Sequence, residues 1–406
     1  MQKIIVLGGG AAGFFAAINI PYNNNTCSVI ILEKSNKLLS KVRISGGGRC
    51  NVTHSCYEIK ELSKNYPRGE KELIGPFSRF SVKDTIEWFE KKGVKIKKEE
   101  DGRMFPVSDN SETIIDCLME QAHKYNVTIK TGVEIKHIKK VNEHFVLETV
   151  SGNFECDKLI IATGGNYKTS SYNILTELGH TINEPVPSLF TFNIPNNALT
   201  SLQGVSVARA LVKISGYKLE THGPVLITHW GLSGPAVLRL SAIGAKLLHQ
   251  KKYDFTASIN WLNEMRPDDV KNILLNHKKN DPSKKIINLN SFDIPNRLWK
   301  FILLKCGIND TLKTADLSNK QINKLADCFC SDNYQVTGKT TFKEEFVTCG
   351  GVSLKEVDMK TMQSKLVSGL FFAGEVLNID GITGGFNFQN AWTTGWIAAQ
   401  QMQVQD

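Results

Sequence analysis

The sequence lacks the features that mark several protein classes. Its nine cysteines include no CxxC pair, and no Cys/His set has zinc spacing, so we expect neither a disulfide framework nor a metal site. No apolar run reaches the ~20 residues of a membrane span, and the glycine-rich stretch 4–20 lacks the basic start of a signal peptide. Solenoid repeats and low-complexity tracts are also missing. These absences predict a soluble, cytoplasmic protein with reduced thiols.

The composition is that of an ordinary globular protein, but its charge is unevenly distributed. The 406 residues include 49 Lys and Arg against 40 Asp and Glu, a net charge of +9. At ~150 residues per domain, this length suggests two or three domains. Residues 190–340 carry a charge of +9, while 1–189 (+3) and 341–406 (−3) cancel. Any acidic substrate or partner is therefore expected on residues 190–340.

The first strong motif is a glycine-rich turn between a strand and a helix. Residues 3–7 (KIIVL) read as a buried strand and are followed by the G-x-G-x-x-G match Gly8–Gly13. A helix-like run, 14–20, and a second strand, 28–32, come next, and the second strand leads to Glu33. This order of strand, glycine turn, helix, strand and acid is the context that a dinucleotide-binding fingerprint requires.

Each residue type in this motif has a physical reason. Gly8 makes the tight turn, Gly10 leaves room for a pyrophosphate, and Gly13 lets the helix pack closely on the strand. The free N–H groups at the helix N-terminus would face the phosphates. Glu33 would accept hydrogen bonds from the adenosine ribose, and its charge argues against a 2′-phosphate in this site.

Later glycine clusters favour FAD over a nicotinamide dinucleotide as the resident cofactor. A second glycine-rich loop with basic residues, 41–51 (KVRISGGGRCN), follows shortly after the acidic residue. Strand-like runs at 158–162 and 369–373 lead into Thr163-Gly164-Gly165 and Gly374-Glu375. A larger, extended cofactor explains these additional approaches of backbone to ligand. No second fingerprint follows a later strand, so we expect no separate NAD(P)H domain.

The sequence resembles the YhiN/BaiN-type flavoproteins, also described as aminoacetone-oxidase-like FAD enzymes. The matching blocks are Gly8–Gly13, Glu33-Lys34, Lys41–Asn51, Ala162–Gly165, Thr228–Ala236, Thr348–Val352 and Phe372–Trp392. Small departures occur at Gly9 and at Phe386, where Tyr is common in the family. The loop 166–172 lacks the usual Pro and extra Gly, so substrate choice can differ there.

The resemblance implies an α/β fold with a discontinuous, Rossmann-like FAD-binding domain of the two-dinucleotide-binding type. Residues 1–189 and 341–406 would form this domain, and 190–340 would be an insert, first β-barrel-like and then helical. The residue pattern of the insert supports this division. Strand-like runs occur at 211–218, 224–229 and 254–260, and the pattern turns helical from 267 to 330.

The resemblance also extends the set of candidate cofactor residues. Gly384-Gly385 would open a helix over 387–399 whose N-terminus faces the flavin N1–C2=O edge and favours negative charge there. Val133 would lie against the adenine, Lys41 near the pyrophosphate and Glu375 near the ribityl chain. The full predicted set is Gly8, Gly10, Ala11, Ala12, Gly13, Glu33, Lys34, Lys41, Gly46, Gly47, Gly48, Arg49, Cys50, Asn51, Val133, Thr163, Gly164, Gly374, Glu375, Gly385, Asn387 and Phe388.

His229 is the candidate catalytic residue, because the turn around Gly231 and Gly234 would expose it beside Trp230 as an acid/base group. A His that only stabilises this turn is the alternative. Cys50 and Cys56 could form a redox pair next to the flavin, but a small residue buried in a glycine loop explains Cys50 better. The two arginines of this loop, Arg43 and Arg49, either add positive charge for the cofactor or lie on the surface.

The function predicted from these residues is that of an FAD-dependent oxidoreductase acting on a small organic molecule. Hydride would pass through flavin N5 to or from substrate, O2 or NAD(P)H as a transient donor. One alternative is an FAD-dependent RNA-modifying or RNA-binding protein. Nucleic acid is not the expected partner, because the lysine pairs have little aromatic or arginine content between them. Another alternative is a flavin-binding protein without turnover. The oligomeric state stays open.

Overall fold

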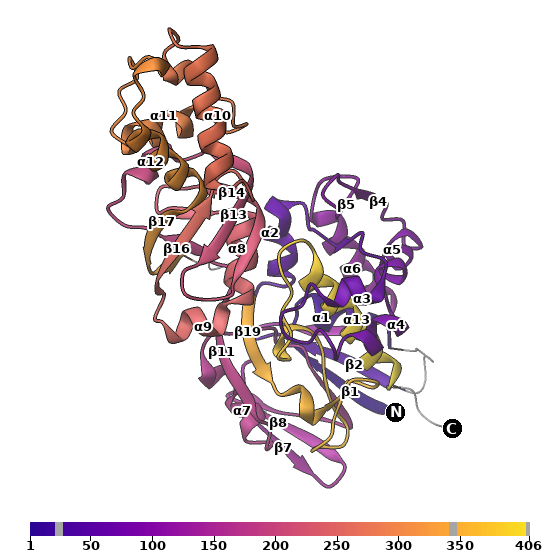
Figure 1. Cartoon of the computed structure of the whole chain (residues 1–406). Helices are drawn as coiled ribbons and strands as arrows, with labels where there is room; N and C mark the ends of the chain where they lie inside the picture. The colour runs from indigo at the N-terminus through magenta and orange to yellow at the C-terminus, as the bar shows by residue number, and fades with distance from the viewer. Residues whose placement is uncertain (21–26, 341–346, 403–406) are drawn as a thin grey trace. The chain divides into compact units, whose positions relative to one another are not determined.

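The computed structural model describes residues 1–20, 27–340 and 347–402, and the chain separates into two compact units (Figure 1). Unit 1 comprises Met1–Ser188 and Phe342–Asp406, and unit 2 comprises Leu189–Thr341. The boundaries predicted at 189/190 and 340/341 each lie one residue from these. Each unit has its own hydrophobic core.

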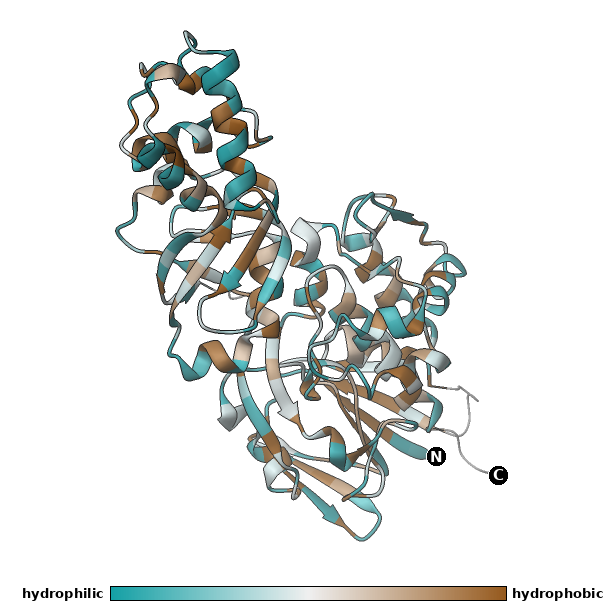
Figure 2. Ribbon diagram, in the orientation of Figure 1, coloured by the Kyte–Doolittle hydropathy of each residue, from teal (hydrophilic) through white to brown (hydrophobic). Residues whose placement is uncertain are grey.

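Unit 1 is built on a seven-stranded sheet whose central strands are parallel. The strand order is β20-β21-β22-β10-β1-β2-β6, with β22, β10, β1, β2 and β6 parallel and β20 and β21 antiparallel. The strands are β1 (Gln2–Leu7), β2 (Cys27–Leu32), β6 (Thr128–Lys130), β10 (Lys158–Ile161), β20 (Val357–Asp358), β21 (Gln363–Ser364) and β22 (Leu370–Phe372). Strands β1 and β2 are mostly apolar, as Figure 2 shows, because both faces of a parallel sheet are covered.

Smaller sheets and helices surround this sheet in unit 1. The strands are β3 (Thr53–His54), β4 (Ile96–Lys98), β5 (Arg103–Pro106), β7 (Ile135–Val141), β8 (His144–Thr149), β9 (Gly152–Cys156), β11 (Ile182–Ser188) and β19 (Val347–Val352). The helices are α1 (Ala11–Ile18), α2 (Ser40–Gly48), α3 (Ile59–Ser63), α4 (Ile74–Arg79), α5 (Val82–Glu90), α6 (Glu112–Lys124), α7 (Asn173–Thr176) and α13 (Phe386–Gln400). The predicted strands at 3–7, 28–32, 158–162 and 369–373 and the helix at 387–399 are confirmed within one to three residues.

Helices α1 and α13 pack against each other through small residues. A Cβ built on Gly395 of α13 would lie 2.8 Å from the carbonyl oxygen of Ala12 in α1. A Cβ on Gly374 would lie 2.7 Å from the Cβ of Ala12. Only glycine fits at such distances, so Gly395 brings α13 close to α1, and Gly374 brings the turn after β22 close to the same helix.

Unit 2 contains a second seven-stranded sheet, which is antiparallel and curls round on itself. Its order is β17-β16-β13-β14-β15-β12-β18. The outermost strands of this order, β17 and β18, are separated only by Gly338, which bonds to Tyr253 beside β16 and to Asn193 of β12. The sheet is therefore barrel-like, as predicted. The strands are β12 (Thr191–Asn193), β13 (Ser206–Ile214), β14 (Glu220–Ile227), β15 (Gly231–Ser233), β16 (Asp254–Asn260), β17 (Asp332–Thr337) and β18 (Lys339–Thr340).

Helices complete unit 2 and include the predicted helical stretch. They are α8 (Pro235–Ile243), α9 (Ala245–Gln250), α10 (Pro267–Asn280), α11 (Asn296–Lys305) and α12 (Asn319–Cys330). In Figure 1, α10, α11 and α12 gather at one end of the curled sheet. Their core includes the buried Trp299 and Phe329, whose rings stack at 5.7 Å. Within residues 1–20, 27–340 and 347–402, no helix has the length and apolar character needed to cross a membrane.

Candidate active site

The glycine turn of unit 1 has the geometry of a phosphate-binding turn. Gly8 has φ +119°, and a Cβ there would lie 2.3 Å from the carbonyl oxygen of Ala162. A Cβ on Gly13 would lie 1.9 Å from the carbonyl oxygen of Gly8, so α1 packs directly on the turn. A Cβ on Gly10 would meet nothing within 4 Å. Gly10 is the N-cap of α1 and no side chain caps it, which leaves the helix N-terminus accessible to an anion.

Glu33 is held at the carboxyl end of β2 by two backbone donors. Its carboxylate accepts from the N–H of Gly9 at 2.7 Å and from the N–H of Ser35 at 2.8 Å. These bonds orient the carboxylate while each oxygen keeps further acceptor capacity. The neighbouring Lys34 pairs with Glu134 at 2.7 Å. The N–H of Val133 donates to the carbonyl of Glu33 at 2.9 Å, so an adenine contact at Val133 would use its carbonyl.

The loop at the end of α2 bends through three glycines. Gly46, Gly47 and Gly48 have φ of +59°, +70° and +85°, which side chains rarely adopt. The loop leads to buried Asn51, whose amide, oriented to satisfy both its groups, donates to the carbonyl of Thr53 at 2.9 Å and accepts from the N–H of Gly385 at 3.0 Å. The predicted N-terminal and C-terminal cofactor segments therefore meet at Asn51.

Cys50 follows this loop as a buried residue with φ +60°. Burial raises the pKa of its thiol to about 12, so the thiol stays protonated and a poor nucleophile at neutral pH. Burial also raises the pKa of the Cys56 thiol. These properties favour a structural role for Cys50 over a redox pair.

Lys41 and Glu375 lie 334 positions apart in the sequence and form an ion pair. The Lys41 Nζ lies 2.7 Å from Oε2 of Glu375, while Oε1 of Glu375 accepts from the N–H of Thr348 at 2.7 Å. A Cβ on Gly165 would lie 2.6 Å from the same Oε1. Three predicted cofactor segments therefore converge: α2, the turn after β10, and the turn after β22.

Helix α13 begins at a glycine turn and has no side-chain cap. Gly385 is its N-cap with φ +94°, and a Cβ there would lie 2.5 Å from the carbonyl oxygen of Thr53. The side chain of Asn387 accepts from the N–H of Gly381 at 2.8 Å and donates to the carbonyl of Gly381 at 2.9 Å. Asn387 thus fixes the loop before the helix, while Phe388 stacks on Trp392 with ring centres 5.7 Å apart.

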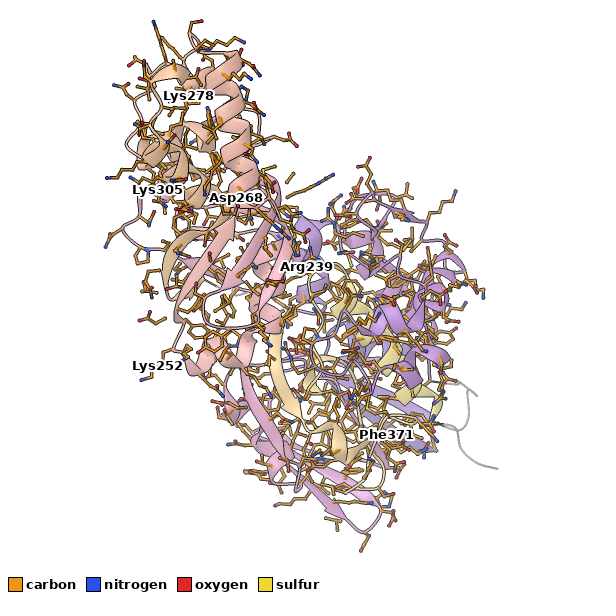
Figure 3. The ribbon with its side chains drawn as sticks, viewed as in Figure 1. Arg239, Lys252, Asp268, Lys278, Lys305 and Phe371 are labelled. Carbon is orange, nitrogen blue, oxygen red and sulfur yellow. The ribbon has the colours of Figure 1, made fainter. Side chains whose placement is uncertain are left out.

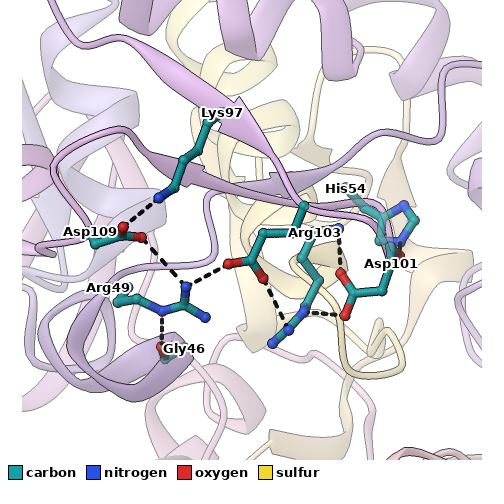
Figure 4. Close-up of polar contacts among 8 residues, drawn as sticks. Gly46, Arg49, His54, Lys97, Asp101, Arg103 and Asp109 are labelled. Carbon is teal, nitrogen blue, oxygen red and sulfur yellow. Dashed lines mark hydrogen bonds and ion pairs between the residues drawn. The ribbon is translucent and has the colours of Figure 1, made fainter.

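The two arginines of the 41–51 loop are engaged by carboxylates. Arg49 lies between Glu99 at 2.6 Å and Asp109 at 3.4 Å, with its guanidinium 4.0 Å from the ring centre of Phe105 (Figure 4). Asp109 also pairs with Lys97. Arg43 pairs with Glu112. These partners give both arginines a role in holding the 41–51 loop to neighbouring elements, and a cofactor contact by Arg49 stays a prediction.

The structure contains a buried ion pair near the start of α13 that could not be predicted from the sequence. Asp380 is fully buried and accepts from Nε of Arg68 at 2.6 Å, with a second bond to the same guanidinium, and from the hydroxyl of Ser188 at 2.8 Å. The hydroxyl of buried Tyr66 donates to the carbonyl of Phe386 at 2.6 Å. Asp380 lies inside a block quoted for the family resemblance, but nothing in the sequence identifies Arg68, Ser188 or Tyr66 as its neighbours.

His54 also lies beside this loop, and it was not among the predicted site residues. Its ring stacks on Phe386 with centres 4.8 Å apart, and Nε2 lies 3.2 Å from the carbonyl oxygen of Asp101. Burial lowers the pKa of its imidazole. His54 is therefore favoured in its neutral form.

His229 lies in unit 2, in the turn between β14 and β15, and its side chain is exposed. Backbone bonds between Thr228 and Gly231 close this turn, at 2.8 and 3.3 Å, and Thr228 Oγ1 adds further bonds. The His229 ring lies against Trp230 with centres 3.5 Å apart. A catalytic role for His229 stays a prediction.

The chemistry of this donor set fits FAD. An uncapped helix follows an open glycine position, an oriented acid ends the second strand, and an uncapped C-terminal helix begins beside the 41–51 loop. The fold and these residues define a flavoprotein of the Rossmann type, an FAD-dependent oxidoreductase. The chain belongs to the HI0933-like family, whose Rossmann-domain model matches residues 2–401.

Three curated relatives each align over nearly the whole chain. A 3-dehydro-bile acid delta(4,6)-reductase from Clostridium scindens is 28% identical over 98% of each chain. A ribosomal RNA dihydrouridine synthase from Escherichia coli is 30% identical over 98% of this chain and 97% of that protein. A protein of the same name from Haemophilus influenzae is 28% identical over 99% of this chain and 98% of that protein.

Solved structures share the fold at low sequence identity. A 3-ketosteroid delta1-dehydrogenase from Sterolibacterium denitrificans is 11% identical, covers 99% of both chains and has a TM-score of 0.52. A 3-ketosteroid-delta4-(5alpha)-dehydrogenase from Rhodococcus jostii RHA1 is 12% identical with a TM-score of 0.51, over 98% of this chain and 97% of that one. These likenesses concern the fold alone.

Unit 1 also contains a buried histidine, His180, whose protonation should make the stability of the fold depend on pH. The buried His180 side chain lies between Glu356, 3.2 Å from Nδ1, and the Ser364 hydroxyl, 3.0 Å from Nε2. Burial lowers the pKa of this imidazole from 6.5, although Glu356 opposes the shift. The unfolded chain then binds more protons below about pH 6.5, so stability is present above that pH and is lost as the pH falls.

We expect the urea midpoint to fall between about pH 7.5 and pH 5.5, a window above the ordinary carboxylate range. Urea titrations monitored by tryptophan fluorescence at several pH values would measure this change. The variant His180→Gln should be less stable at pH 7.5 and show a shallower decline with falling pH. An unchanged slope in that variant would contradict the role of His180.

Proposed function

We propose that this protein is an FAD-dependent reductase of a carbon–carbon double bond conjugated to a carbonyl, with NAD(P)H as the electron donor. The observation that carries the proposal is the uncapped N-terminus of α13 at Gly385, which Asn51 and Asn387 hold in place. A helix N-terminus favours negative charge, and a reduced flavin at that end would be stabilised toward its anion.

The names of the curated relatives support this choice of reaction. The Clostridium scindens protein is named for reducing double bonds in a 3-dehydro-bile acid, where the 3-oxo group is conjugated with the 4,6-diene. A dihydrouridine synthase saturates a ring double bond of uracil that is also conjugated to a carbonyl. The two names therefore denote one type of chemistry on different substrates.

When bound, FAD would supply the redox chemistry, the transfer of hydride from NAD(P)H to the substrate carbon β to the carbonyl. A proton must then reach the α carbon, and the exposed His229 is our candidate for this acid. The residues of unit 1 would bind and orient the cofactor: α1 would receive the pyrophosphate, Glu33 the ribose, and Lys41 with Glu375 the middle of the molecule.

Anaerobic stopped-flow measurements on the holoenzyme test the proposal. We expect NADPH or NADH to bleach the flavin absorbance near its main visible band, and a 3-oxo-4-ene steroid or a uracil-containing RNA to restore it without oxygen. Mass spectrometry should find a product that has gained two hydrogen atoms. Reoxidation by air alone, with no turnover of either acceptor class, would contradict a reductase and favour an oxidase.

The variant His229→Gln separates the proton step from flavin reduction. Bleaching by NAD(P)H should proceed at the wild-type rate, while turnover of the acceptor should fall on the order of 100-fold, the usual contribution of general acid catalysis. Equal turnover in variant and wild type would leave the turn with a structural role only.

A uracil base in ribosomal RNA is a second candidate substrate. The names of the relatives from Escherichia coli and Haemophilus influenzae favour it, since both align over nearly the whole chain. The charge distribution favours it too, because unit 2 carries the entire net charge. This candidate differs from our expectation of a small-molecule partner, and the two acceptor classes in the experiment above distinguish them.

A further inference from the structure

Both parts of unit 2 carry net positive charge. Residues 267–330, from the start of α10 to the end of α12, contain ten Lys and one Arg against seven Asp and no Glu, a net charge of +4. The remainder of unit 2 has nine basic and four acidic residues, a net charge of +5. The helical part, α10, α11, α12 and their connecting loops, therefore carries somewhat less than half of the charge.

Five lysines gather at the end of this part, where the loop after α10 pairs with the loop before α12. We call Lys278, Lys279, Lys284, Lys285 and Lys313 the lysine tip. The N–H of Ile286 donates to the carbonyl of Leu312 at 3.0 Å, and the N–H of Thr314 donates to the carbonyl of Lys284 at 2.9 Å. These bonds place Lys285 opposite Lys313 in an antiparallel bridge.

The opposed lysines are fixed by a buried residue. Thr314 is fully buried, and its hydroxyl lies 2.6 Å from the carbonyl oxygen of Asp281 and 2.8 Å from that of Lys284. Side chains directly opposite each other in such a pair have Cβ atoms about 5 Å apart, and like charges there are destabilising. The backbone therefore holds two cations together at a cost that a bound anion would relieve.

Few carboxylates neutralise the tip. Lys284 pairs with Asp281 at 2.7 Å, and the Lys278 Nζ donates to the carbonyl of Leu317. Lys279, Lys285 and Lys313 are exposed, and no carboxylate within residues 1–20, 27–340 or 347–402 forms an ion pair with them. Figure 3 labels Lys278 near the end of α10.

We propose that the lysine tip docks the sugar–phosphate backbone of RNA, an inference that rests on the second candidate function. Phosphate contacts position a nucleic acid without reading its sequence, so the scarcity of arginine and aromatic residues here is no obstacle. Lysine binds phosphate as a point charge. The exposed Asn280 and Ser283 add groups able to bond phosphate or a 2′-hydroxyl. Selection of the base would occur at the flavin.

The test compares two triple variants of the FAD-loaded full chain. Lys279→Gln/Lys285→Gln/Lys313→Gln removes three charges from the tip. Lys218→Gln/Lys246→Gln/Lys252→Gln removes three exposed charges elsewhere in unit 2, and Figure 3 shows Lys252 at the opposite end of this unit from Lys278. Fluorescence anisotropy would measure binding to purified ribosomal RNA and to phosphatidylglycerol vesicles over a range of salt concentrations.

We expect the tip variant to bind ribosomal RNA on the order of 10-fold more weakly at ~100 mM salt, with a salt dependence reduced by about two to three units of slope. The control variant should stay within about two-fold of wild type. Both should keep their flavin absorbance and their rate of reduction by NADPH.

Three results would overturn the inference. The first is equal weakening in both variants, which would indicate only general electrostatics. The second is no binding of RNA by wild type at low salt. The third is binding of the vesicles but not of RNA, which would point to a membrane surface. Tip-dependent RNA binding without reduction of uracil would leave the docking surface standing while refuting the second candidate function.

Discussion

Replacing Gly10 with alanine should leave the chain folded and remove most of its FAD, whereas replacing Gly13 should disrupt both. A Cβ on Gly10 meets nothing within 4 Å among the residues that the structure describes, and Gly10 has φ −95°, so alanine adds no strain. The same Cβ would occupy the space into which a pyrophosphate fits. Losing one or two N–H contacts to phosphate, each worth about 1.5–3 kcal/mol, should weaken FAD binding roughly 10- to 100-fold or more.

Gly13 differs because its Cβ would lie 1.9 Å from the carbonyl oxygen of Gly8. That distance is far inside van der Waals contact, so α1 must move away from the turn. Overpacking of this kind costs about 1–3 kcal/mol and more where backbone must shift. We therefore expect a lower urea midpoint as well as loss of cofactor.

A third variant, Gly75→Ala, provides the matched control. Gly75 lies in α4, and a Cβ there meets nothing within 4 Å. Flavin absorbance per protein, FAD titration by fluorescence quenching and urea unfolding would be measured for all three variants. Full FAD occupancy in Gly10→Ala would contradict placement of the pyrophosphate at this turn.

The parts of the fold that could be predicted are those in which the backbone geometry of one continuous stretch limits which residues can occupy it. In the turn at Gly8–Gly13, Gly8 has φ +119° and a Cβ on Gly13 would meet the carbonyl of Gly8, so both positions require glycine for local reasons, and apolar strands precede and follow the turn. The helix at 387–399 and the strand at 254–260 likewise follow from short-range patterns, and α13 and β16 confirm them. The curled sheet of unit 2 was predicted from the family resemblance, with three strand-like runs in support.

Side-chain partners distant in the sequence could not be predicted. Arg49 looked like a cofactor cation, but the register of β4 and β5 brings Glu99 to its guanidinium, and the turn after β5 brings Asp109. The partner of Asp380 is 312 positions away, at Arg68. A charged residue has many possible partners of similar energy, and only the packed structure selects one. The bridge that places Lys285 opposite Lys313 could not be predicted either, because it joins the backbones of two loops that are separated in the sequence.

Replacing Asp380 with asparagine should strongly destabilise unit 1 and release FAD. Burial raises the pKa of the Asp380 carboxyl even beside Arg68, which shows how costly it is to bury this charge. Asparagine keeps one acceptor oxygen but removes the negative charge that faces the largely buried guanidinium of Arg68, and breaking a buried ion pair in this way costs about 3–5 kcal/mol. The loop 374–385, which leads into α13, would lose its anchor at the same time.

Two further variants distinguish the loss of the buried charge at Asp380 from the loss of a single hydrogen bond. Ser188→Ala removes the 2.8 Å bond to Asp380 while leaving the ion pair, and should cost only about 1 kcal/mol. The double variant Arg68→Met/Asp380→Leu removes both charges, and apolar replacement of a buried pair is often neutral or stabilising. It should therefore recover much of the stability that Asp380→Asn loses.

Retention of FAD in the double variant then decides what the pair does. If the ion pair serves stability alone, FAD affinity should recover together with the urea midpoint. We expect the urea midpoint to recover while FAD binding stays weaker, because a flexible Met and Leu cannot hold the backbone at 380 in the way two directed bonds do.

The exposed pair Glu61–Lys64 is the control, and Glu61→Gln should change neither the urea midpoint nor the FAD affinity measurably. An Asp380→Asn protein as stable as wild type would refute the argument, because losing the carboxylate charge beside the buried guanidinium of Arg68 would then cost nothing.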